Sequence, residues 1–129
     1  MLENKQILLV EDDFLIARPL AEKLEDAGAS VIGPTGTIEE GIALIAGNPD
    51  IDGALMDVNL GGEMSYPVAY DLLRRGVPFV FLTAYDPSLV AARFRDVPVF
   101  AKPVEFERVL EALQTATESR QQRSVASNG

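Results

Sequence analysis

The chain has 129 residues, carries a formal net charge of −9 and contains no Cys, His or Trp. Its length fits one domain, and 47% hydrophobic with 24% charged residues is typical of a globular protein. The missing Cys and His exclude a disulfide scaffold, a thiolate zinc site, a Ser-His-Asp triad and a phosphohistidine on this chain. The acidic charge disfavours nucleic acid and an anionic membrane surface, so we expect neither as a partner.

The N-terminal segment indicates where the protein resides. Residues 1–6 lack the basic and apolar segments of a signal peptide. No apolar run reaches the roughly 18 residues that a membrane span requires. We therefore expect a cytoplasmic protein.

Short apolar runs alternate with segments of helical spacing along the chain. The runs are predicted as strands over residues 7–10, 30–33, 53–58, 77–83 and 97–101. The helical segments are predicted over residues 14–27, 37–47, 66–75, 86–94 and 109–116. Thr37 and Glu40 have the spacing of a capping box, whereas Pro19 is expected to kink the first helix or delay its start.

This alternation predicts the fold class. Strands that alternate with helices favour an α/β fold with a parallel sheet. Right-handed crossovers place helices on both faces, so we expect a doubly wound five-stranded parallel sheet with five helices. We expect the domain to cover residues 1–118, and residues 119–129, which have few apolar anchors, to form a flexible C-terminal tail.

Polar residues stand where the predicted strands end. These residues are Glu11, Asp12 and Asp13 after the first strand, Asp57 in the third, Thr83 in the fourth and Lys102 after the fifth. Because the carboxyl ends of parallel strands meet at one edge of a sheet, we expect these side chains to gather there.

Crowded acids at such an edge predict a metal site, because they repel one another unless a cation joins them. Oxygen ligands without His or Cys suit a hard ion, and Mg²⁺ is favoured over Ca²⁺ because nothing resembles a calcium loop. Asp12, Asp13 and Asp57 are the candidate ligands, although Asp13 taken alone is typical of an N-cap of the first helix. A carboxylate in a metal site is also a competent nucleophile toward phosphorus.

The order and spacing of these sites resemble the receiver domain of bacterial two-component response regulators, over residues 5–117. The resemblance implies a flavodoxin-like fold with strand order 2-1-3-4-5. It implies that Asp57 is the phosphoacceptor, that Asp12 and Asp13 hold Mg²⁺, and that the backbone carbonyl of Asn59 completes the coordination. It further implies that Thr83 is the switch hydroxyl, that Lys102 pairs with the phosphoryl group, and that the Lys102–Pro103 bond is cis.

One position departs from the family pattern. Val99 stands three residues before Lys102, where the family usually has Tyr or Phe. Tyr85 and Phe100 are therefore additional switch candidates. The run 81–85 is similar to the Phe-Ala-Thr-Gly-Tyr run of a single-domain receiver subfamily, which implies a stand-alone regulator.

The resemblance implies a role in a phosphorelay, and it implies partners. The donor would be a sensor histidine kinase or a histidine phosphotransfer protein, and the signal would pass to an unknown downstream protein or the domain would serve as a phosphate shuttle or sink. A homodimer through the fourth helix, fifth strand and fifth helix is a further expectation. We expect no enzyme activity beyond the domain's own phosphorylation and dephosphorylation.

Two alternatives stay open. A Mg²⁺-dependent phosphatase with Asp57 as nucleophile normally needs a second carboxylate two residues later, and Asn59 stands there. A receiver-like binding module without phosphorylation would not need Asp57, Thr83 and Lys102 to be intact.

Overall fold

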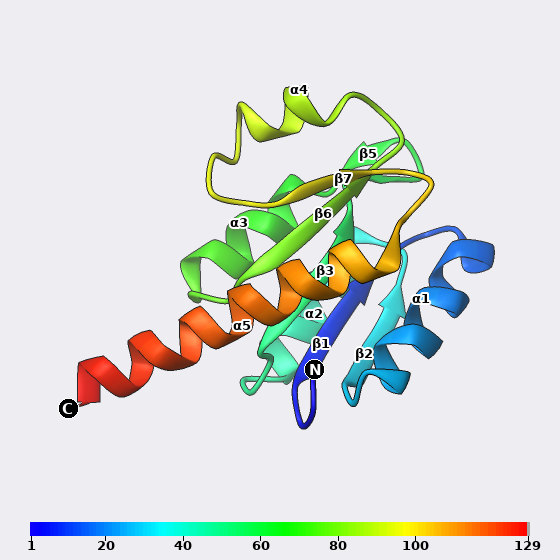
Figure 1. Cartoon of the computed structure of the whole chain (residues 1–129). Coiled ribbons are helices and arrows are strands. Elements are labelled where there is room, and N and C mark those ends of the chain that lie inside the picture. Colours follow the sequence, from blue (N-terminus) through cyan, green and yellow to red (C-terminus); the bar gives the residue numbers. More distant parts are fainter. Residues whose placement is uncertain (129) are drawn as a thin grey trace.

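The computed structural model describes the backbone of residues 1–128 and the side chains of residues 1–120. A five-stranded sheet has the order β2-β1-β3-β6-β7, and all of its neighbouring strands pair in parallel (Figure 1). Its strands are β1 (Gln6–Val10), β2 (Ser30–Thr35), β3 (Gly53–Asp57), β6 (Phe79–Thr83) and β7 (Val99–Ala101). The predicted fold class and strand order are therefore confirmed.

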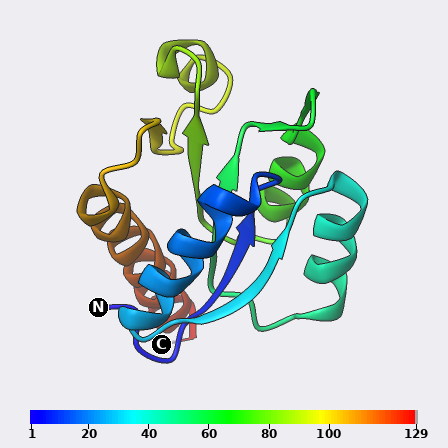
Figure 2. The same cartoon turned by 90° about the vertical axis from the view of Figure 1, so that its right-hand side faces the viewer.

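Helices cover both faces of this sheet (Figure 2). They are α1 (Phe14–Asp26), α2 (Ile38–Gly47), α3 (Tyr66–Arg74), α4 (Pro87–Ala91) and α5 (Phe106–Asn128). Successive residues of a strand point to opposite faces, so Leu8 of β1 packs in the core under α2, α3 and α4, whereas Leu9 packs in the core under α1 and α5. The sheet thus separates two apolar cores, and its carboxyl edge lies beside both of them.

A short hairpin follows β3, in the segment between the predicted strand 53–58 and the predicted helix 66–75. It consists of β4 (Asn59–Leu60) and β5 (Glu63–Met64), which pair antiparallel. Gly61 and Gly62 form its turn with φ of 60° and 96°. A two-residue hairpin turn with positive φ at both positions favours glycine, which explains this Gly-Gly pair.

Two elements continue through a proline: the start of α1 is not delayed by Pro19, and β2 runs beyond its predicted end at residue 33. Helix α1 begins directly after Asp13 and runs on past Pro19. Pro19 removes the donor for the carbonyl of Leu15, a residue that lies on the exposed side of the helix, where water can replace it. Strand β2 continues through Pro34 to Thr35, because it is an edge strand in which a missing N–H is tolerated.

Helix α5 extends past residue 118, where the sequence predicts the end of the domain. Arg120 donates to the backbone carbonyl of Ile51 at 2.8 Å and ties this part of α5 to the segment before β3. The backbone is helical as far as Asn128, and the flexibility of residues 119–129 stays a prediction. Among residues 1–128, no helix is both long and apolar enough to cross a membrane.

Candidate functional site: an acidic rim at the carboxyl edge of the sheet

The strand order brings the predicted site residues to one rim. Glu11 and Asp12 directly follow β1, and Asp57 is the last residue of the adjacent strand β3. Thr83 ends β6, and Lys102 follows β7. Residues that are far apart in the sequence therefore meet at neighbouring strand ends, as the parallel topology requires.

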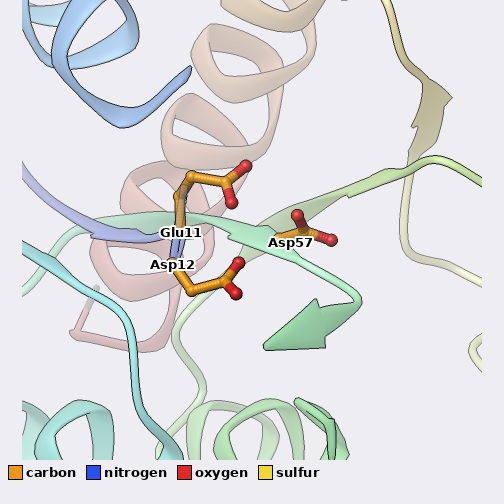
Figure 3. Close-up of side chains that lie close together, drawn as sticks. All are labelled: Glu11, Asp12 and Asp57. Carbon is orange, nitrogen blue, oxygen red and sulfur yellow. The ribbon is translucent and has the colours of Figure 1, made fainter. Parts of the chain in front are cut away.

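Three carboxylates form the centre of this rim (Figure 3). One oxygen from each of Glu11, Asp12 and Asp57 lies within 4.8 Å of the other two. Glu11 and Asp57 are buried, whereas Asp12 is exposed. Acidic oxygens this close, two of them on buried side chains, are an unfavourable arrangement without a cation.

Lys102 supplies one positive charge. Its Nζ donates to Glu11 Oε1 at 2.8 Å and to Asp57 Oδ2 at 2.5 Å. Burial lowers the pKa of Lys102, but the hydrogen bonds and charges of Asp57 and Glu11 raise it by more, so that its pKa lies above the ordinary value. Lys102 is therefore a protonated bridge between β1 and β3.

Glu11 is the most perturbed acid of the rim. Burial raises its pKa to about 7, against the lowering effect of hydrogen bonds from Lys102 and from the backbone N–H of Asp13. The charge of Asp57 raises this pKa further. A group whose ionised form is unfavourable in the metal-free protein is one that a bound cation would stabilise.

The structure separates the roles of Asp12 and Asp13. Asp12 Oδ2 accepts a hydrogen bond from the backbone N–H of Gly61 at 2.8 Å, which joins the rim to the hairpin. Asp13 Oδ1 accepts from the N–H of Leu15 at 2.9 Å and caps α1. The close group of three carboxylates therefore contains Glu11 and not Asp13, whose side chain is turned to the helix N-terminus, and the role of Asp13 as a metal ligand stays a prediction.

The carboxylate and the backbone of Asp57 are both held. The N–H of Asn59 donates to Asp57 Oδ1 at 3.0 Å, while Lys102 holds Oδ2. Ser65 Oγ donates to the backbone carbonyl of Asp57 at 2.6 Å. Ser65 is a contact that the sequence pattern did not indicate.

The predicted switch residues lie in different surroundings. Thr83 is fully buried, and its Oγ1 accepts from the N–H of Tyr85 at 2.9 Å. The ring of Tyr85 lies at the surface, with 57% of the residue exposed. Phe100 packs against the core under α1 and α5 and under the guanidinium of Arg108, 5.5 Å from the ring centre. Val99 packs on the other side of the sheet, so the ring of Phe100 does not occupy the place of an aromatic side chain at position 99.

A hollow of about 370 Å³ lies over the rim. Its lining residues are Glu11, Asp12, Asp13, Ile16, Asp57, Asn59, Gly61, Ala84, Tyr85 and Lys102. Its donor set is made of carboxylates, and oxygen ligands of this kind fit a hard divalent ion such as Mg²⁺. Glu11, Asp12 and Asp57 are the residues that could hold this ion.

The chain resembles known proteins in sequence and in structure. No family model matches it. It is 29% identical over 117 residues to the transcriptional regulatory protein PdtaR of Mycobacterium tuberculosis, a match that covers 87% of this chain and 56% of PdtaR. The chain thus spans about half the length of that curated relative.

Two solved structures are similar over nearly their whole length. SdrG of Sphingomonas melonis Fr1 is 40% identical, with 85% of this chain and 96% of SdrG covered and a TM-score of 0.71. A response regulator receiver protein of Sinorhizobium medicae WSM419 has the same fold, with a TM-score of 0.82, 22% identity, and 93% and 99% of the two chains covered. With the acidic rim, the strand order and these relatives together, the chain belongs to the receiver-domain family of response regulators.

Proposed function

We propose that this domain accepts one phosphoryl group on Asp57 in a Mg²⁺-dependent step. The observation that carries the proposal is the bridge from Lys102 to Glu11 and Asp57, beside the carboxylate of Asp12. Within one hollow, Asp57 would be the nucleophile, the three carboxylates would hold the cation, and Lys102 supplies a fixed ammonium group. The related SdrG has been solved in a BeF₃-activated conformation at 43% identity, which supports phosphorylation of this rim.

The proposed reaction is a transfer to the carboxylate of Asp57. One carboxylate oxygen attacks the phosphorus of a phosphohistidine on a donor protein, an O–P bond forms and the P–N bond breaks. The electron pair stays on the imidazole nitrogen, which takes up a proton. Lys102, already 2.5 Å from Asp57 Oδ2, is placed to meet the incoming phosphoryl oxygens.

Mg²⁺ held by Glu11, Asp12 and Asp57 would offset the negative charge that the phosphoryl group adds to the rim. The backbone carbonyl of Asn59 is proposed as a further ligand, since Asn59 lines the hollow. Ala84 also lines this hollow, and its N–H is proposed to donate to a phosphoryl oxygen. Thr83 is proposed as the switch hydroxyl. It would give up the hydrogen bond that it accepts from the N–H of Tyr85 and would donate to the phosphoryl group instead.

A groove beside the rim is the proposed docking place of the phosphoryl donor. Its lining residues are Leu15, Ile16, Pro19, Leu20, Lys23, Lys102, Pro103, Val104 and Phe106. Leu15 of this lining and its neighbour Phe14 are both exposed at the start of α1. Because these 129 residues contain no His, the phosphoryl donor lies outside them, and we propose a sensor histidine kinase or a histidine phosphotransfer protein.

The output is proposed to be contact with a further protein in the cytoplasm, or storage of the phosphoryl group. The face of α4, β7 and α5 would make this contact or form a homodimer. We propose that the domain catalyses only its own phosphorylation and dephosphorylation, because Asn59 occupies the position at which an aspartyl-phosphate phosphatase has its general acid.

The test is the intact mass of the protein after incubation with acetyl phosphate, with and without Mg²⁺. One added phosphoryl group that requires Mg²⁺ and is absent in Asp57→Asn is the expected result. Continuous release of phosphate from small esters would favour the phosphatase instead. If a kinase or phosphotransfer protein that phosphorylates other receivers also leaves the wild type unlabelled, the binding-module alternative is favoured.

A further inference from the structure

Ser65 is the N-cap residue of α3, yet its hydroxyl does not cap that helix. Its Oγ donates instead to the carbonyl of Asp57 at 2.6 Å, and its N–H donates to the carbonyl of Val58 at 2.7 Å. Ser65 is fully buried. Both hydrogen-bond donors of Ser65 are therefore used on the carbonyls of Asp57, the last residue of β3, and of Val58, which follows it.

This use of an N-cap serine is unusual within the chain. The N-cap residues Asp13, Thr37 and Asp86 have extended backbones with ψ of 107°, 153° and 118°, and each accepts an N–H of its own helix. Ser65 has ψ of 9°, which turns its side chain away from the helix. A side-chain capping bond stabilises a helix, and α3 gives this bond up.

Two features make this exchange physically reasonable. Pro67 stands in the first turn of α3 and has no N–H, so the helix has one donor fewer to satisfy. The register of β1 on β3 ends at the pair Val10 and Met56, so the carbonyl of Asp57 lies beyond the paired part of that ladder. A buried carbonyl without a donor is costly, and Ser65 satisfies it.

From these contacts we infer that Ser65 is a positioning residue for the phosphoryl acceptor. It fixes the peptide group between Asp57 and Val58, and with it the direction in which the carboxylate of Asp57 leaves the strand. The N–H of Asn59, 3.0 Å from Asp57 Oδ1, is attached to the same stretch of backbone. Loss of the Ser65 hydroxyl would let this peptide tilt and would misalign the carboxylate for attack. The inference rests on the proposed phosphorylation of Asp57.

The experiment compares Ser65→Ala with Thr117→Val. Thr117 is also buried and also donates to a backbone carbonyl, that of Leu113 at 2.8 Å, but it lies against Gly53 at the opposite end of β3. Both variants lose one buried hydroxyl, but the carbonyl of Leu113 keeps its helical N–H donor in Thr117→Val, so we expect the larger fall in Tm in Ser65→Ala. At saturating Mg²⁺ we expect Ser65→Ala to be phosphorylated by acetyl phosphate about 10-fold more slowly than the wild type, and Thr117→Val at the wild-type rate.

A second measurement does not depend on phosphorylation. The amide resonance of Asn59 in metal-free protein reports the hydrogen bond to Asp57 Oδ1, and we expect it to shift in Ser65→Ala and to stay in place in Thr117→Val. If Ser65→Ala does not fold, Ser65→Cys, which keeps the shape with a weaker donor, is expected to show the same two effects in smaller measure. An unchanged rate together with an unchanged Asn59 amide would overturn the inference. If neither acetyl phosphate nor a phosphorylated protein donor labels the wild type, the proposed function fails, while the Asn59 shift still decides the role of Ser65.

Discussion

The backbone N–H of Gly61 donates to Asp12 Oδ2 at 2.8 Å, across 49 positions of the chain. The turn of the β4–β5 hairpin is thereby attached to an acid of the proposed metal site. Gly61 has φ of 60°, and a Cβ added there would meet Asp12 Oδ2 at an ordinary contact distance of 3.7 Å. Backbone conformation, rather than space, thus determines which residues Gly61 can be replaced by.

The first prediction follows from this contact. A β-branched residue strongly disfavours positive φ, so Gly61→Val is expected to displace the N–H and to weaken Mg²⁺ binding about 10-fold. Asn tolerates this conformation, and Gly61→Asn is expected to bind Mg²⁺ within about twofold of the wild type. Isothermal titration measures both affinities. Equal losses in the two variants would show that the contact with Asp12 does not depend on this backbone conformation.

The second prediction concerns the bridge at Lys102. Lys102→Met leaves Glu11 and Asp57 buried without their counter-charge, and we expect the metal-free protein to lose about 1–3 kcal/mol of unfolding free energy. Mg²⁺ is expected to raise the unfolding free energy of Lys102→Met by more than it raises that of the wild type. The control is Arg18→Met, which removes an exposed ion pair with Glu22 and is expected to cost less than about 1 kcal/mol. Urea denaturation with and without Mg²⁺ checks both, and equal effects in the two variants would contradict the burial argument.

The third prediction is the pH dependence that Glu11 creates. Its pKa of about 7 in the folded, metal-free protein lies above the ordinary value of 4.5, so between these pH values the folded state binds more protons than the unfolded state. The contribution of Glu11 to stability is therefore full below pH 4.5 and falls as the pH rises toward 7. Protons compete with Mg²⁺ for this carboxylate, so Mg²⁺ affinity should fall below about pH 7. Glu11→Gln should flatten the stability profile over this range, and an unchanged profile in that variant would assign the pH dependence to another group.

The fourth prediction concerns stability away from the rim. Burial raises the pKa of Asp71, but hydrogen bonds from Arg74 and Arg75 outweigh it and lower the pKa below the ordinary 3.8. Asp71 therefore contributes stability at neutral pH that is lost as the pH falls through its folded-state pKa. We expect Asp71→Asn to be less stable than the wild type at pH 7 and to approach it in acid. Thermal unfolding between pH 2 and 7 measures this, and a constant difference would show that charge is not the cause.

The fold was predictable because strand and helix signals are local. Unbroken apolar runs such as 7–10 and the capping pair of Thr37 and Glu40 indicate their elements without tertiary information. The membership of the acidic cluster was harder to predict, because Asp13 fits both a metal ligand and an N-cap in the sequence, and the structure shows that its side chain caps α1. A Gly-Gly pair is typical of a hairpin turn. The contact of Gly61 with Asp12 joins residues far apart in the chain, however, and no local pattern predicts it. The bond from Ser65 to Asp57 is likewise invisible in a sequence in which serine before a helix predicts a cap.

The sheet separates two cores, and this separation has a consequence for assembly. The groove beside α1 lies on one face of the sheet, and α4 packs on the other. A protein seated in the groove and a protein bound to α4 would approach the domain from opposite faces of the sheet. A donor in the groove and a second protein on α4 would therefore not compete for one surface, whereas a protein bound to α5 would lie on the side of the groove, because Phe106 of α5 lines it.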